Sequence, residues 1–153
     1  MGGNSTYDAV LKGIPEIART HFALSQRIDG HKILLQKKNS NRVQLPMNSN
    51  SESPLYLCAH TKKNGTVEVT SIGIYENHKC VAQIDLEFDK DGNYKPYVKG
   101  NKKTSHFHYF NIDPNTGGVG RKSHDRHNTH PIDETLTPLI QKIVFFNKQK
   151  HKL

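Results

Sequence analysis

The stretch PLYLCAHTKKNGTVEVTSIGIYENHKCVAQIDLEF, residues 54–88, carries the clearest β-strand signal in the chain. Its segments are rich in β-branched residues and are separated by short polar turns. Asn64-Gly65 is typical of a β-hairpin connection, because glycine admits a positive φ. In the last segment apolar residues alternate with polar ones, Gln83 and Asp85 among them, which predicts one buried face and one wet face. We expect a meander of antiparallel strands here.

The residues before this stretch predict helices and then short strands. A capping-box spacing starts a helix at Ser5, and from Pro15 to about Arg27 apolar residues recur at three- and four-residue spacing, on one helical face. Asp29-Gly30 is expected to end this helical region as a turn. Strands are expected at residues 31–38 and 42–45.

Thr137 and Pro138 supply the N-cap and first position of a closing helix with an apolar stripe. The sequence therefore predicts an α+β fold with N-terminal helices, a central antiparallel sheet of four to five strands and a C-terminal helix. We expect a single domain over residues 1–153. Its predicted parts are helical residues 5–28, a sheet at 31–112, a basic, histidine-rich loop at 113–136 and the closing helix at 137–150.

The chain is polar and basic, with a net charge of +8 and only 33% hydrophobic residues. From Lys95 onward it has 11 Lys and Arg against 4 Asp and Glu, a net charge of +7, whereas residues 1–94 have 11 against 10, a net charge of +1. Such asymmetry indicates either a polyanionic partner, most commonly nucleic acid, or a basic surface that serves solubility.

Cys58 and Cys80 have no zinc-ribbon or C-x-x-C spacing and fit two buried free thiols in a reducing compartment. No apolar run approaches the roughly 18 residues that a membrane span needs. We expect a cytoplasmic protein with no membrane partner.

Residues 105–130, SHFHYFNIDPNTGGVGRKSHDRHNTH, hold five of the ten histidines together with basic residues and a glycine-rich loop. Histidine can exchange a proton near neutral pH without a perturbed environment, so this cluster indicates chemistry on an anion such as a phosphate. In a strand at residues 104–112, His106 and His108 would project from one face and Tyr109 from the other.

Metal-independent RNA cleavage needs a base for the 2′-hydroxyl, an acid for the leaving 5′-oxygen and cations that stabilise the phosphorane. The order of acid and base between His106 and His108 stays open. The predicted catalytic residues are His106, His108, His124, Lys122, Arg121 and Tyr109. The predicted nucleic-acid-binding residues are Ser105, Ser123, Arg126, His127, Lys102 and Lys103.

A short helical start, an antiparallel sheet, and histidines with basic residues on the late strands and loop resemble the fold of metal-independent ribonuclease toxins of the barnase, EndoU and RelE-like type. The HFH run at residues 106–108 and the GRKSHD run at residues 120–125 are similar to toxin-like domains that are appended to phage minor head proteins. The resemblance covers residues 55–153 and implies an endoribonuclease with RNA as partner more than DNA. It further implies an inhibitor or immunity protein, and either cytoplasmic or virion-associated localisation with delivery into the host cytoplasm.

Three alternatives compete with this hypothesis. The histidines could be ordinary surface residues, and the basic region could bind nucleic acid without catalysis, as in a virion-associated protein. In a metal hydrolase, His106, His108 and one of His124, His127 or His130 would form a three-histidine zinc site, with Asp125 in support. The leading hypothesis needs no metal and no cofactor.

Overall fold

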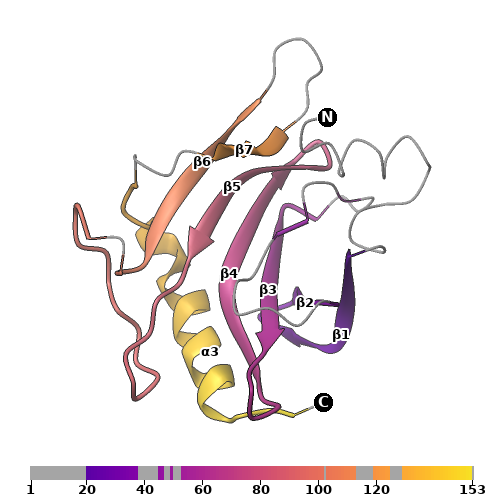
Figure 1. The fold of residues 1–153 in the computed structure, drawn as a ribbon, viewed down its shortest axis with the longest axis vertical. Helices are drawn as coiled ribbons and strands as arrows, with labels where there is room; N and C mark the ends of the chain where they lie inside the picture. The colour runs from indigo at the N-terminus through magenta and orange to yellow at the C-terminus, as the bar shows by residue number, and fades with distance from the viewer. Residues whose placement is uncertain are drawn as a thin grey trace.

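The computed structural model describes residues 20–37, 45–46, 49, 53–101, 103–112, 119–124 and 129–152, and at residues 111–112 and 119–124 it describes the backbone only. In this part of the chain, seven strands form one sheet in the order of the sequence (Figure 1). A short 3₁₀ helix, η1, and one α-helix, α3, follow the strands. The bounds are β1 His21–Ile28, β2 His31–Gln36, β3 Leu55–Thr61, β4 Val67–Glu76, β5 Lys79–Asp85, β6 His106–Ile112, β7 Val119–His124, η1 Glu134–Leu136 and α3 Thr137–Lys148.

The predicted meander is confirmed for β3, β4 and β5, which pair antiparallel. The prediction of an all-antiparallel sheet of four to five strands is wrong. β2 pairs parallel with β3, and β1, β6 and β7 extend the sheet to seven strands. A parallel pair requires a long connection between its strands, and residues 37–54 supply it here.

The prediction of N-terminal helices is wrong for residues 21–28, which form β1; residues 5–19 lie outside the described part of the chain. The Asp29-Gly30 turn exists, but it connects β1 to β2, with positive φ angles of 52° and 81°. β1 buries His21 and Ile28 and partly buries Leu24, a spacing of three and four residues. A register shift between residues 23 and 27 permits this spacing in a strand, and that is why the pattern imitates a helix.

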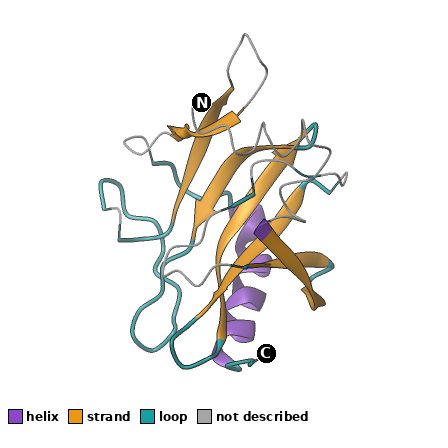
Figure 2. Cartoon of the chain, turned by 45° about the vertical axis from the view of Figure 1, so that its right-hand side comes forward, coloured by secondary structure: helices purple, strands orange, loops and turns teal. Residues whose placement is uncertain are grey.

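The helix α3 lies along one face of the sheet (Figures 1 and 2). On that face Ile33, Leu57, Ile72 and Ile84 pair in turn across four neighbouring strands, and each is 0% exposed. The helix completes this core with an apolar stripe of Leu139, Ile140, Ile143 and Phe146. The apolar core therefore lies between α3 and the sheet.

The opposite face of the sheet has a smaller apolar cluster that includes Tyr56, Cys58, Tyr75 and Cys80. The Tyr75 hydroxyl donates a hydrogen bond of 2.6 Å to the backbone oxygen of Pro46, which ties a connecting segment onto this face. Both cysteines are buried thiols that are not part of a disulfide, as the sequence predicted.

The predicted closing helix is confirmed as α3, although Leu136, not Thr137, is its N-cap, so that Pro138 is its second residue. The predicted loop at residues 113–136 is wrong where the chain forms β7 and η1, and residues 113–118 and 125–128 lie outside the described part. The strand predicted at residues 42–45 also falls outside it, except for Leu45, which is not in a strand. Among the described helices, none combines the length and the apolar character needed to span a membrane.

A side-chain amide joins α3 to the sheet. Asn147 Oδ1 accepts a hydrogen bond of 2.9 Å from the Val69 amide, and Asn147 Nδ2 donates one of 2.9 Å to the Val69 carbonyl. The β4–β5 pairing begins at Ser71 opposite Asp85, two residues further along β4. Asn147 therefore provides hydrogen-bond partners to the backbone of Val69, at a position of β4 that β5 does not reach.

We expect Asn147→Leu to destabilise the fold by about 1–3 kcal/mol, because it leaves the backbone groups of Val69 without partners in a part-buried position. Urea unfolding followed by circular dichroism measures this change. Gln141→Leu, at an exposed position of α3, is the matched control and should stay within about 0.5 kcal/mol of the parent. Equal stabilities of the two variants would contradict this role of Asn147.

Candidate functional site

The site lies on the sheet face away from α3, where β5 and β6 meet. Asp85 pairs with His106 across these strands, and Gln83 pairs with His108. The intervening pair, Ile84 and Phe107, belongs to the helix side, where Phe107 packs against the core. Because side chains alternate along a strand, four polar groups collect on one face while their neighbours fill the core on the other.

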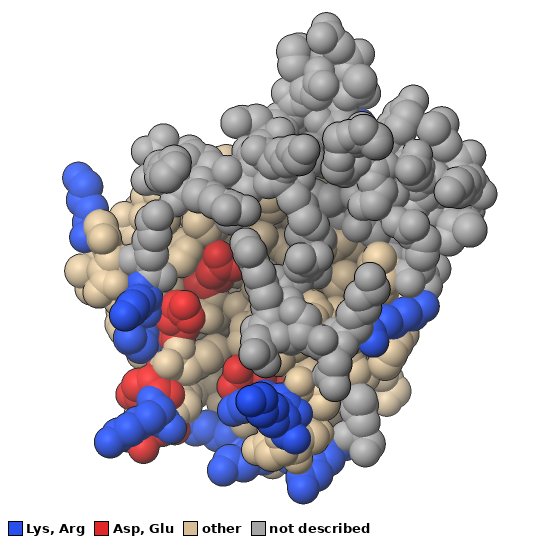
Figure 3. Space-filling view, in the orientation of Figure 1, with Lys and Arg blue, Asp and Glu red and all other residues tan. Residues whose placement is uncertain are grey.

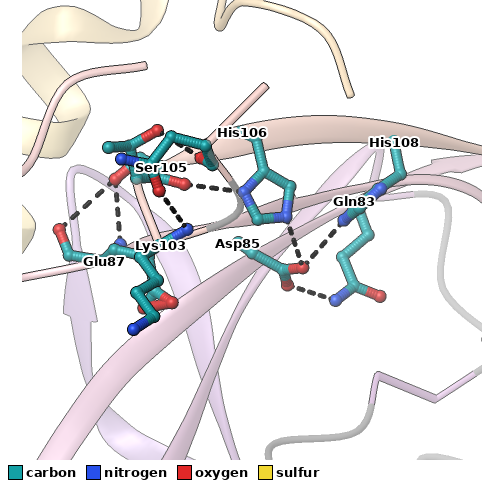
Figure 4. A network of polar contacts seen from close by, with 9 residues as sticks. Gln83, Asp85, Glu87, Lys103, Ser105, His106 and His108 are labelled. Atoms are coloured by element: carbon teal, nitrogen blue, oxygen red, sulfur yellow. Dashed lines mark hydrogen bonds and ion pairs between the residues drawn. The ribbon is translucent and has the colours of Figure 1, made fainter. Parts of the chain in front are cut away.

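These four side chains form one hydrogen-bonded cluster (Figure 4). One carboxylate oxygen of Asp85, Oδ2, lies 2.9 Å from Nε2 of His108 and 3.3 Å from Nε2 of His106. The other, Oδ1, accepts a hydrogen bond from the Gln83 amide. The two imidazole rings stand nearly perpendicular, with centroids 4.4 Å apart. Asp85 is therefore the centre of the cluster.

The backbone fixes the orientation of the His106 ring. Its Nδ1 lies 2.7 Å from the carbonyl oxygen of Thr104, which can only accept a hydrogen bond, so Nδ1 carries a proton. Its Nε2 faces the carboxylate of Asp85. Both ring nitrogens of His106 thus face oxygen acceptors.

The electrostatics follow from these contacts. Burial alone would raise the pKa of the Asp85 carboxyl, but hydrogen bonds from His106, His108 and Gln83 outweigh burial and hold this pKa well below its usual range. The hydrogen bond to Asp85 raises the pKa of His106 above its ordinary value, against burial, which lowers it. The carboxylate is therefore ionised at neutral pH.

The two imidazoles are buried, with 6% of His106 and 4% of His108 exposed. The side chain of Asp85 keeps 29% of its surface exposed. Solvent and small solutes therefore reach the cluster at its carboxylate. The interpretation of these two histidines as ordinary surface residues is excluded.

Further titratable groups lie just after β5 and on β3 and β4. Burial raises the pKa of Glu87, and the negative charge of Asp85 raises it further. Glu68 pairs across β3 and β4 with His60, whose pKa is lowered by burial. His60 Nδ1 is buried and has no hydrogen-bond partner among the described residues. Glu87 thus adds a second carboxyl group that interacts electrostatically with Asp85.

Of the residues predicted for catalysis, the structure brings His106 and His108 together on one face, as the strand alternation predicted. Tyr109 lies on the opposite face, is 55% exposed and has its ring 5.5 Å from that of His130. Arg121, Lys122 and His124 belong to β7, of which only the backbone is described. The backbone of His124 pairs with Phe110, so β7 runs beside the strand that carries His108.

Of the residues predicted to bind nucleic acid, Ser105 is fully buried. Its hydroxyl accepts a hydrogen bond of 2.9 Å from the Glu87 amide, which engages it within the fold. Lys103 is exposed, and Ser123 is described only in its backbone. Lys102, Arg126 and His127 lie outside the described residues.

The sequence analysis did not identify Asp85 and Gln83 as site residues. Their alternation with apolar residues correctly placed them on a polar face, but nothing in that pattern indicates which strand lies beside β5. Only the register between β5 and β6 brings them to the histidines.

A metal ion could be held by Asp85, His106 and His108, which each offer one donor atom, all within 4.8 Å of one another. The predicted three-histidine site is not supported for His130, which contacts Tyr109 on the other face. The histidines at 124 and 127 have no described side chains, so their part in that alternative is not tested.

No family model matches this chain, and no curated protein and no solved structure matches it either. The resemblance to ribonuclease toxins therefore stays a prediction. Function has to be inferred from the chemistry of the cluster.

The His106–Asp85 contact predicts a pH-dependent stability in buffer that contains EDTA. An unfolded histidine has a pKa of about 6.5, and the pKa of His106 in the folded protein is higher. The contact therefore stabilises the fold fully below about pH 6.5, and this stabilisation is lost as the pH rises through the folded-state pKa. The low pKa of Asp85 keeps its carboxylate charged throughout this range.

Urea unfolding between about pH 6 and pH 9 measures this contribution. The free energy of unfolding should fall more steeply with pH in the parent protein than in Asp85→Asn, which removes the carboxylate. Parallel pH profiles of the two proteins would show that the His106–Asp85 contact contributes nothing to stability.

Proposed function

We propose that this protein is an endoribonuclease whose reaction centre is the cluster of Asp85, His106 and His108. The observation that supports the proposal is a part-buried, ionised carboxylate shared by two buried imidazoles. Well-packed apolar residues are often as stabilising as a buried ion pair, so such a cluster is weak evidence for a role in stability alone. Titratable groups with strongly perturbed pKa values gather at sites of chemistry.

The choice of RNA as substrate is supported by charge. The chain from Lys95 to Ile112, which leads into β6 and includes both histidines, has four lysines and no acidic residue. Figure 3 shows described lysine and arginine side chains at several separate places on this face, some of them next to acidic ones. The proposal therefore places the RNA near β6 and β7, where the basic residues of the final third begin.

RNA carries its own nucleophile, the 2′-hydroxyl, so the site does not have to supply one. The 2′-oxygen attacks the adjacent phosphorus, the bond from phosphorus to the 5′-oxygen breaks, and the products are a 2′,3′-cyclic phosphate and a 5′-hydroxyl. The 2′-hydroxyl proton leaves to a base, and the 5′-oxygen takes a proton from an acid. The negative charge that develops on the phosphorane between these two events needs a cation beside the centre.

A cleavage assay with end-labelled RNA tests the proposal. We expect Asp85→Asn and His108→Gln to reduce the cleavage rate by about 10²–10⁴-fold, because each removes a group of the centre. Tyr109→Phe is the matched control from the same strand and should cleave like the parent, because Tyr109 lies on the opposite face.

All proteins in this assay should be purified in parallel and compared by circular dichroism, so that contamination and misfolding are detected. If the parent protein binds RNA and leaves it intact, the proposal of an enzyme is wrong, and a non-catalytic nucleic-acid-binding protein takes its place. Equal losses in the cluster variants and in Tyr109→Phe would place the reaction elsewhere.

A further inference from the structure

We infer that Asp85, His106 and His108 form a binding site for one divalent transition-metal ion, and that the proposed RNA cleavage depends on this ion. The dependence rests on the proposed function, whereas the binding site rests on geometry alone. The sequence-based hypothesis of a metal-independent reaction would then be replaced.

The donor atoms are already close to the spacing that a metal imposes. Bonds of about 2.0–2.2 Å from zinc to nitrogen and oxygen place neighbouring ligand atoms roughly 3–3.5 Å apart. The Asp85 Oδ2 atom lies 2.9 Å and 3.3 Å from the two Nε2 atoms. All three donor atoms lie within 4.8 Å of one another, and side-chain rotations that replace the hydrogen bonds by metal bonds would admit an ion between them.

The outer contacts resemble those that support metal ligands in proteins. A ligating histidine usually donates its second N–H to a backbone carbonyl or a carboxylate, which fixes its tautomer, and ligating carboxylates are themselves hydrogen-bonded. His106 donates Nδ1–H to Thr104, and Asp85 accepts from Gln83 through the oxygen that does not face the histidines. His106 and Asp85 thus have outer partners of this kind.

Hydrogen-bond accounting also favours a cation at this point. Two ring nitrogens converge on one carboxylate oxygen, and each must carry a proton to avoid opposing lone pairs. His106 then carries two protons, since its Nδ1 is bonded to Thr104. A metal ion would take the place of both Nε2 protons. Each ring would then be neutral, and its Nε2 lone pair would bind the ion.

The donor set selects the class of metal. Imidazole nitrogen suits zinc, copper, iron and nickel, whereas magnesium, calcium and manganese prefer oxygen ligands. Three protein ligands leave at least one position open, as in catalytic and not structural zinc sites. Such a position could take a phosphate oxygen or water at the exposed side of Asp85.

Calorimetric titration of the chelator-stripped protein with zinc chloride tests the site without RNA. We expect one zinc ion to bind per chain. The affinity for zinc should be weaker by more than about 100-fold in Asp85→Asn and in His108→Gln. Gln83→Met, which removes an outer contact only, should weaken binding by about 10–100-fold. His130→Ala is the matched histidine control and should bind like the parent.

Cobalt substitution of the parent protein gives a second measurement that does not depend on variants that fold. A visible absorption band that saturates at one equivalent and is removed by zinc supports the site. The proposed site is overturned if the parent protein shows no saturable zinc binding. It is also overturned if folded Asp85→Asn and His108→Gln bind zinc as tightly as the parent.

The outcomes separate this inference from the proposed function. Cleavage that persists in EDTA without zinc binding overturns the metal site and leaves the ribonuclease in place. Zinc binding without cleavage of RNA supports the site and removes the ribonuclease. Cleavage that is lost in EDTA and restored by zinc or cobalt but not by magnesium supports both.

Discussion

Burial of the apolar stripe of α3 against one face of the sheet determines what the other face can do. Ile84 and Phe107 lie on the helix side, so their neighbours Asp85 and His106 are directed away from the core by the alternation of β5 and β6. A shift of one residue in this register would exchange the two sets and place the carboxylate in the core. Fold and site are thus fixed by the same pairing.

The sequence was sufficient for features that depend on local periodicity. The alternation in residues 104–112 placed His106 and His108 on one face, and the spacing in residues 137–150 gave the closing helix. It failed at β1, where a register shift buries residues at helical spacing. A helix and a strand with such a register shift bury residues at the same spacing. The pairing of residues 21–28 with β2 decides that a strand forms.

The acidic member of the cluster was beyond sequence reasoning for a different reason. Asp85 is 21 residues before His106, and Gln83 is one of several polar residues on a half-buried strand. Their roles depend on which strand lies beside β5 and in which register, a non-local property without a local signal. Tyr109 shows the converse, because it neighbours His108 in sequence and lies on the opposite side of the sheet.

The charge of the cluster bears on how it could act on a phosphate. With one protonated histidine beside the ionised Asp85, the cluster is electrically neutral and offers a phosphodiester little attraction. A second proton would give a net charge of +1, but two imidazolium ions 4.4 Å apart repel by roughly 4 kcal/mol at an effective dielectric constant of about 20. A divalent ion between two neutral imidazoles and the carboxylate gives the same net charge without that repulsion. Of the two states with a net positive charge, the metal-bound one avoids the repulsion between two imidazolium ions.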